Sequence, residues 1–63
     1  MRNDIQIIET RFVNAREVAT VLGVSESTGY RLIREMNLEL KKQGKITIAG
    51  KISRRYFEEK VYL

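Results

Sequence analysis

A short turn between two helical patterns constrains this chain more than any other feature. Residues 15–22 and 26–43 place apolar side chains at three- to four-residue spacing, and Gly23-Val24-Ser25 separates them. Glycine ends a helix readily because it adopts the left-handed conformation without steric cost, and serine is a favoured cap of the next helix. Two helices that cross at so short a turn leave the second free to enter a DNA major groove. The pattern therefore predicts a helix-turn-helix.

The residues beside each pattern set the helix ends. Asn14 is predicted to cap the first helix, and Glu17 stands where it can return a hydrogen bond to the cap. Ser25 is predicted to cap the second helix, which we expect to run from residue 26 to about 43 before Gly44 ends it. The apolar positions expected to face the core are Val18, Ala19, Val21 and Leu22 in the first helix and Leu32, Ile33, Met36 and Leu40 in the second.

Extended patterns flank the two helices. Residues 5–13 alternate in part, which predicts a short N-terminal strand or an extended arm. Residues 45–48 alternate cleanly, Ala49-Gly50-Lys51 predicts a tight turn, and Ile52 then begins the return strand of a β-hairpin. Ser53 is a candidate cap for a last helix that ends near Tyr62. The order predicts a single domain over residues 1–63, an α+β but mostly helical winged helix-turn-helix.

Composition excludes several classes of function. A chain of 63 residues buries only about 60% of its unfolded surface, which leaves no room for a substrate cavity beside a core. It has no cysteine and no histidine, which excludes disulfides, thiolate catalysis and the usual zinc ligands. No acid/base pair, phosphate loop or metal cluster is present. We therefore expect a binding protein rather than an enzyme, with no cofactor, metal or small-molecule ligand.

The N-terminal residues and the apolar pattern bear on location. No apolar run approaches the roughly 20 residues that span a bilayer, so no membrane partner is expected. No signal peptide is expected, because the first residues include Asp4 and no apolar core segment. We expect a cytoplasmic protein.

Positive charge is concentrated in the second half of the chain. Residues 1–29 carry three arginines against four acidic residues, whereas residues 30–63 carry nine lysines and arginines against four glutamates. This asymmetry is typical of proteins that bind a polyanion, and double-stranded DNA is the expected partner. The alternative is a lysine-rich face that is only solvated.

The helix-turn-helix resembles a known superfamily. The segment Val-Ala-Thr-Val-Leu-Gly-Val-Ser-Glu-Ser-Thr-Gly-Tyr-Arg-Leu-Ile, residues 18–33, is similar to that of mercury-resistance (MerR-like) regulators and excisionases, and residues 54–60 resemble the segment that follows the wing there. The resemblance, strongest to small excisionase-like proteins of phages and mobile genetic elements, extends over about residues 10–62. Larger relatives add a coiled-coil dimerisation helix and an effector domain, and we expect neither in this chain.

The resemblance implies a DNA-binding role on the bacterial nucleoid. The protein would act as a recombination directionality factor, with several copies on adjacent sites directing an integrase towards excision, or as a small transcriptional regulator. The alternative is a protein-interaction module, an antagonist or anti-repressor on the same scaffold. DNA binding requires Arg31, Arg34 and Lys51 on one face, whereas an interaction module should expose an apolar patch.

Side chains at the start of the second helix that the core does not use are expected to face DNA. Arg31 is the best candidate to read a base, because arginine pairs bidentately with guanine, and Arg34 is expected to reach the backbone. Glu26 either accepts from a cytosine amino group or favours the positive helix N-terminus, and the second role is commoner. The full set of recognition-helix candidates is Ser25, Glu26, Ser27, Thr28, Tyr30, Arg31 and Arg34.

A second set of candidates surrounds the predicted wing. A lysine at a hairpin tip contacts a minor groove or phosphates, although lysines also protect an exposed edge strand from pairing. The wing candidates are Lys45, Thr47, Lys51, Arg54 and Arg55.

Two expectations concern packing. Ala19 and Gly29 are expected to touch where the helices cross, and Gly29 indicates either an unusually close crossing or a locally loose site. Tyr56 and Phe57 either lie in the core, which a chain this small favours, or form an exposed aromatic platform for nucleic acid. Ile5, Ile7 and Ile8, with Val61 and Leu63, either close the core or form a protein contact.

Overall fold

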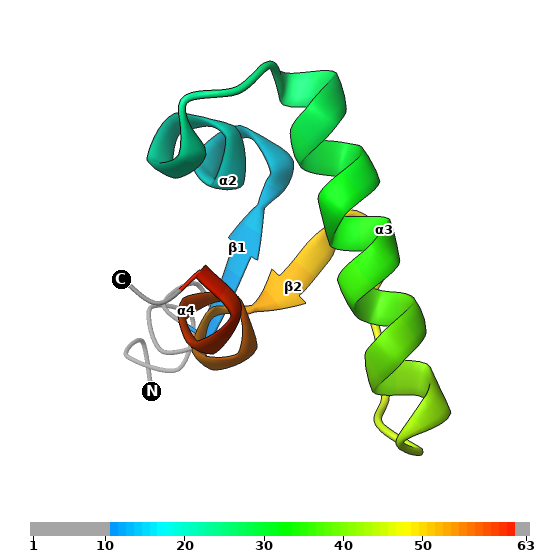
Figure 1. The fold of residues 1–63 in the computed structure, drawn as a ribbon. Coiled ribbons are helices and arrows are strands. Elements are labelled where there is room, and N and C mark those ends of the chain that lie inside the picture. Colours follow the sequence, from blue (N-terminus) through cyan, green and yellow to red (C-terminus); the bar gives the residue numbers. More distant parts are fainter. Residues whose placement is uncertain (1–10, 62–63) are drawn as a thin grey trace, which may run out of the picture.

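The computed structural model describes residues 11–61. Its elements are β1 (Phe12–Asn14), α2 (Ala15–Leu22), α3 (Glu26–Lys42), β2 (Lys51–Ser53) and α4 (Arg54–Val61). Figure 1 shows α3 along one side, α2 and α4 on the other, and the two strands between them. These elements confirm the mostly helical winged helix-turn-helix. No helix among residues 11–61 is long and apolar enough to cross a membrane, and residues 5–10 of the predicted arm lie outside the described residues.

The predicted helix caps are confirmed. The Asn14 side chain accepts a hydrogen bond from the Glu17 N–H at 2.8 Å, and the Ser25 hydroxyl accepts one from the Thr28 N–H at 3.2 Å. The glycine that ends each helix is left-handed, with φ of 71° at position 23 and 82° at position 44. The N–H groups of residues 44 and 45 then bond back to the carbonyls of residues 41 and 40, which closes the end of α3 in a Schellman motif.

The predicted hairpin pairing was wrong. Strand β2 pairs with β1 in antiparallel register, with Val13 opposite Ile52, whereas residues 45–48 contribute a single bridge, from Ile48 to Lys51. Val13 and Ile52 are each only 1% exposed, so this pairing buries two branched side chains that a local hairpin would leave near its edge. We call residues 45–50 the wing loop. It ends in a tight turn where the Lys51 N–H bonds to the Ile48 carbonyl at 3.1 Å.

The core lies between the strands and the three helices of the described chain. It is formed by Val13, Ala15, Val18, Ile33, Ile52 and Phe57, with Leu22, Met36, Leu40, Tyr56 and Val61 packed around it. Phe57 is 2% exposed, so it is a core residue and not part of an aromatic platform. Helix α4 is held at its start by Ser53, whose hydroxyl accepts from the Tyr56 N–H at 3.3 Å, as predicted.

Gly29 lies at a close approach between α2 and α3. A Cβ on this residue would lie 2.5 Å from the Ala15 carbonyl oxygen, and the three nearest atoms all belong to Ala15. The crossing is therefore close rather than loose, and the nearest neighbour of Gly29 is the backbone of Ala15. Ala19, the predicted neighbour, is also buried, at 7% exposure. The close approach fixes the angle at which α3 leaves the domain.

Candidate nucleic-acid interface

Helix α3 presents one exposed stripe to solvent. Ser27, Arg31, Arg34 and Leu38 follow one another at spacings of four, three and four residues, so they share a face, and all four are exposed. This face lies opposite the side of α3 that carries buried Ile33. The two arginines predicted to contact DNA therefore lie together on the surface most available to a groove.

The first turn of α3 is stabilised by its own hydroxyl groups. Ser25 Oγ donates to Thr28 Oγ1 at 3.0 Å and lies 3.2 Å from Ser27 Oγ, in addition to accepting from the Thr28 backbone. Ser25 and Thr28 thus stabilise the helix start, and any contact with phosphate would be made by hydroxyls already held in place. Glu26 is exposed in the same turn, where an acid complements the positive end of the helix.

A groove separates α3 from the wing loop. It has a volume of about 510 Å³ and carries two cationic side chains, Arg34 and Lys41, and no carboxylate. The residues that line it are Tyr30, Ile33, Arg34, Asn37, Leu38 and Lys41 from α3 and Thr47, Ala49 and Gly50 from the wing loop. We call it the α3–wing groove. Its apolar walls and positive charge suit a sugar-phosphate backbone, which is apolar at the sugar and negative at the phosphate.

Two residues of this groove were missed by the sequence reasoning. Lys41 lies seven residues after Arg34, on the same side of α3, and Asn37 lies between them. The Asn37 amide nitrogen donates to the carbonyls of Ile48 and Lys51, at 3.1 and 3.0 Å. The sequence contains one indication of this role. Asparagine is a poor helix former, so an asparagine in the middle of a long helix suggests that its side chain makes a tertiary contact.

The wing candidates separate into two groups. Thr47 lines the α3–wing groove, Lys45 is exposed at the start of the wing loop, and Lys51 is exposed directly after it. Arg54 and Arg55 instead follow β2 into α4, where they line a second depression of about 590 Å³ together with Arg11, Phe12, Ser53 and Glu58. The structure thus groups these two arginines with Arg11 rather than with the residues of the wing loop.

Arg54 also ties two elements together. Its Nη2 lies 2.9 Å from Glu17 Oε2, so the carboxylate predicted to return a bond to the Asn14 cap is engaged by α4. Arg55 extends into solvent at 91% side-chain exposure, with its Nε 3.9 Å from Glu59. Of the two, Arg55 has the freer guanidinium for a phosphate, because a surface ion pair at this distance is weak.

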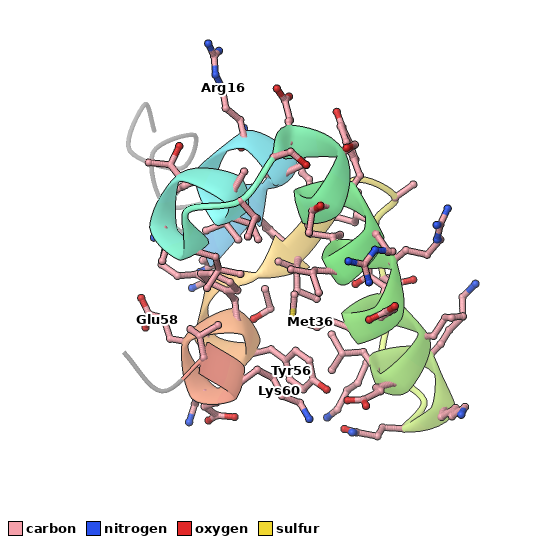
Figure 2. The ribbon with its side chains drawn as sticks, turned by 45° about the horizontal axis from the view of Figure 1, so that its top comes forward. Arg16, Met36, Tyr56, Glu58 and Lys60 are labelled. Atoms are coloured by element: carbon pink, nitrogen blue, oxygen red, sulfur yellow. The ribbon has the colours of Figure 1, made fainter. Side chains whose placement is uncertain are left out.

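A cluster of three polar side chains joins α4 to α3. The Tyr56 hydroxyl donates to Glu39 Oε1, and Lys60 Nζ lies 3.1 Å from the same oxygen. Figure 2 shows Tyr56 and Lys60 extending from α4 towards α3, and Lys60 Nζ lies 5.5 Å from the centre of the Tyr56 ring. The hydrogen bond from Tyr56, followed by that from Lys60, lowers the pKa of Glu39. Glu39 in turn raises the pKa values of Tyr56 and Lys60.

This cluster predicts that the free energy of unfolding decreases at acid pH. Because the pKa of Glu39 is lowered on folding, its contribution is present above the ordinary glutamate value of about 4.3 and is lost as the pH falls towards the lowered value. Tyr56→Phe removes the hydrogen bond and should flatten the decline in unfolding free energy below pH 5. Denaturant titrations between pH 3 and 7 measure it. Parallel curves for the variant and the native protein would show that the hydroxyl does not couple to Glu39.

Comparisons with known proteins identify the family of this chain. Residues 5–60 match the Mga helix-turn-helix domain. The chain is 42% identical over 48 residues to the ICEBs1 excisionase of Bacillus subtilis strain 168, a match that covers 76% of this chain and 75% of that protein. No solved structure matches. The chain belongs to the Mga helix-turn-helix domain family, as a member similar to an excisionase.

Proposed function

We propose that this protein binds double-stranded DNA in a sequence-specific manner and acts as an excisionase-like recombination directionality factor. The stripe of α3 that carries Arg31 and Arg34 enters the major groove, and the wing loop contacts the adjacent minor groove or phosphates. The protein would work in the bacterial cytoplasm by binding, without catalysis. Its partners on the DNA would be an integrase or further copies of itself, and a small transcriptional regulator would use the same interface.

The observation that carries this proposal is the arrangement of cations around the α3–wing groove. Arg34 and Lys41 line its helix side, Lys45 begins the wing loop that forms its other side, and Lys51 directly follows that loop. Because phosphate contacts supply most of the affinity for DNA, a groove bordered by four cations and lined by no carboxylate is a fitting seat for a backbone strand. Similarity to a protein named as an excisionase supports the biological role.

Selection of bound fragments from random and native DNA tests the proposal most directly. We expect a recurrent motif whose number and spacing of half-sites report how many copies bind. Titration of the selected site against scrambled DNA then measures the specificity ratio, expected to be at least about 10³. Failure to retard any fragment at low salt would reject the DNA-binding function, whereas a single isolated site would argue against adjacent copies.

Lys51→Ala tests the contribution of the wing. Lys51 is exposed beside the wing turn, so we expect the variant to bind all sequences more weakly by a similar factor and to lower the slope of log K against log salt by about one unit. Arg16→Ala is the matched control, because it removes one charge from a side chain that points into solvent from α2 (Figure 2). An unchanged slope for Lys51→Ala would remove this lysine from the interface.

Exposed apolar side chains favour a second, protein-binding role. Ile46 and Ile48 of the wing loop are 95% and 44% exposed, and neither lines the α3–wing groove. We propose that they contact a protein bound to the adjacent DNA, an integrase or another copy. Ile46→Ser should leave the affinity for a single half-site unchanged and reduce the binding of a second copy or of the integrase. If Ile46→Ser binds the second copy and the integrase as tightly as the native protein does, this contact is rejected.

A further inference from the structure

The wing loop is fastened to α3 by one side chain. The side-chain amide of Asn37 donates hydrogen bonds to two carbonyls of the same turn, that of Ile48 at 3.1 Å and that of Lys51 at 3.0 Å. These carbonyls belong to the first and the last residue of the turn, since the Lys51 N–H bonds to the Ile48 carbonyl. A single asparagine therefore holds both ends of the wing turn, from a helix whose residue 37 is more than ten positions earlier in the chain.

The backbone of the wing loop provides little rigidity of its own. Within the described chain, residues 45–50 belong to no strand, and their one bridge joins Ile48 to Lys51. The loop is also largely exposed, with Ile46 at 95%. A segment with few buried contacts moves readily unless something fixes it. The contacts of Asn37 are therefore well placed to determine where the loop lies relative to α3.

We propose that Asn37 is a positioning residue, which holds the wing loop at the separation from α3 at which both sides of the α3–wing groove contact one DNA backbone strand. The inference rests on the proposed DNA-binding function and deepens it. Asn37 lines the groove between Arg34 and Lys41, and its amide links this cationic side to the wing turn. When this link is lost, the wing loop moves away from α3 and Lys51 no longer reaches the phosphate it contacts in the native complex, which reduces affinity.

Two substitutions separate the hydrogen bonds from the shape of the side chain. Asn37→Ala removes both donors. Asn37→Asp keeps the size but places acceptors against the Ile48 and Lys51 carbonyls, so it should release the loop more fully. Thr20→Ala is the matched control, because it removes an exposed side-chain hydrogen bond to a backbone carbonyl, that of Arg16, on another helix. The control should bind DNA within about twofold of the native protein, as expected for an exposed side chain.

A double-mutant cycle on the selected DNA site tests the proposal. We expect Asn37→Ala to weaken binding about tenfold and Asn37→Asp at least as much, since each lost hydrogen bond corresponds to about a twofold to tenfold effect. Adding Lys51→Ala to Asn37→Ala should weaken binding by no more than about twofold, because the lysine is already displaced. Adding Arg31→Ala to Asn37→Ala should weaken binding by the same factor as Arg31→Ala does alone, because Arg31 contacts DNA from α3 and not from the wing loop.

Two further measurements separate positioning from general folding. The salt slope of Asn37→Ala should fall as it does for Lys51→Ala, and amide exchange should accelerate at residues 45–51 but not at the core. The inference would be overturned if the losses of affinity from Asn37→Ala and Lys51→Ala simply multiply in the double variant, or if Asn37→Asp binds DNA as tightly as the native protein. It would also be overturned if amide exchange in Asn37→Ala accelerates throughout the domain, the core included. Failure of the native protein to bind DNA would instead reject the proposed function, so the two failures are distinguishable.

Discussion

Gly29→Ala is expected to destabilise the protein by about 2–3 kcal/mol, although the same change in an open helix stabilises it by up to about 1 kcal/mol. The added Cβ would stand 2.5 Å from the carbonyl oxygen of Ala15. This oxygen belongs to the backbone of α2 and cannot rotate away, so the two helices must separate. A domain of this length has a stability of roughly 3–9 kcal/mol, so the loss is a large fraction. Denaturant midpoints measure it.

Gly44 provides the matched control for this prediction. Its φ is +82° and a Cβ there would meet nothing within 4 Å, so Gly44→Ala tests backbone conformation without a clash. That variant should lose about 1–2 kcal/mol, and Gly44→Asn should lose less, because asparagine tolerates the left-handed region. At Gly29 the order should reverse, because asparagine is larger than alanine. A Gly29→Ala protein as stable as the native one would contradict the close crossing.

The local elements of this fold could be predicted because the residues that define them are near in sequence. The caps at Asn14 and Ser25 and the glycine at residue 23 act within about five residues of themselves. The pairing of β2 could not be predicted in this way. Residues 45–48 have the alternation of a strand, but Ile52 gains more burial against Val13, a partner far away in the chain. Tertiary burial decided between the two pairings.

The candidate site shows the same division. The exposed positions of Arg31 and Arg34 follow from the period of α3, and the sequence is sufficient to predict them. Arg54 was grouped with the wing because it is close in sequence, whereas the structure pairs it with Glu17 of α2. The role of Asn37 depends on the path of the wing loop, which no local pattern determines.

Arg31→Ala is expected to weaken binding to the selected DNA site by about 1–3 kcal/mol and to relax sequence preference at one base pair. Arg31 lies on the exposed stripe of α3, with its Nη1 3.5 Å from Glu35 Oε2 and side-chain exposures of 56% and 60%. An exposed pair of this kind contributes only about 0.3–0.5 kcal/mol, so Arg31 loses little free energy when it leaves Glu35 to pair with a guanine edge. Competition titrations against all four base pairs at each position measure the change.

Two variants identify which property of Arg31 is used. Arg31→Lys keeps the charge but loses the planar pair of donors, so it should retain affinity for scrambled DNA and lose discrimination. Glu35→Gln releases the guanidinium from its neighbour, and we expect equal or slightly tighter binding to the selected site. An equal loss by Arg31→Ala on selected and scrambled DNA would assign the residue to a phosphate. Base recognition by α3 would then depend on other residues of the exposed stripe, with Arg34 the first to test, because it is the other guanidinium on that face.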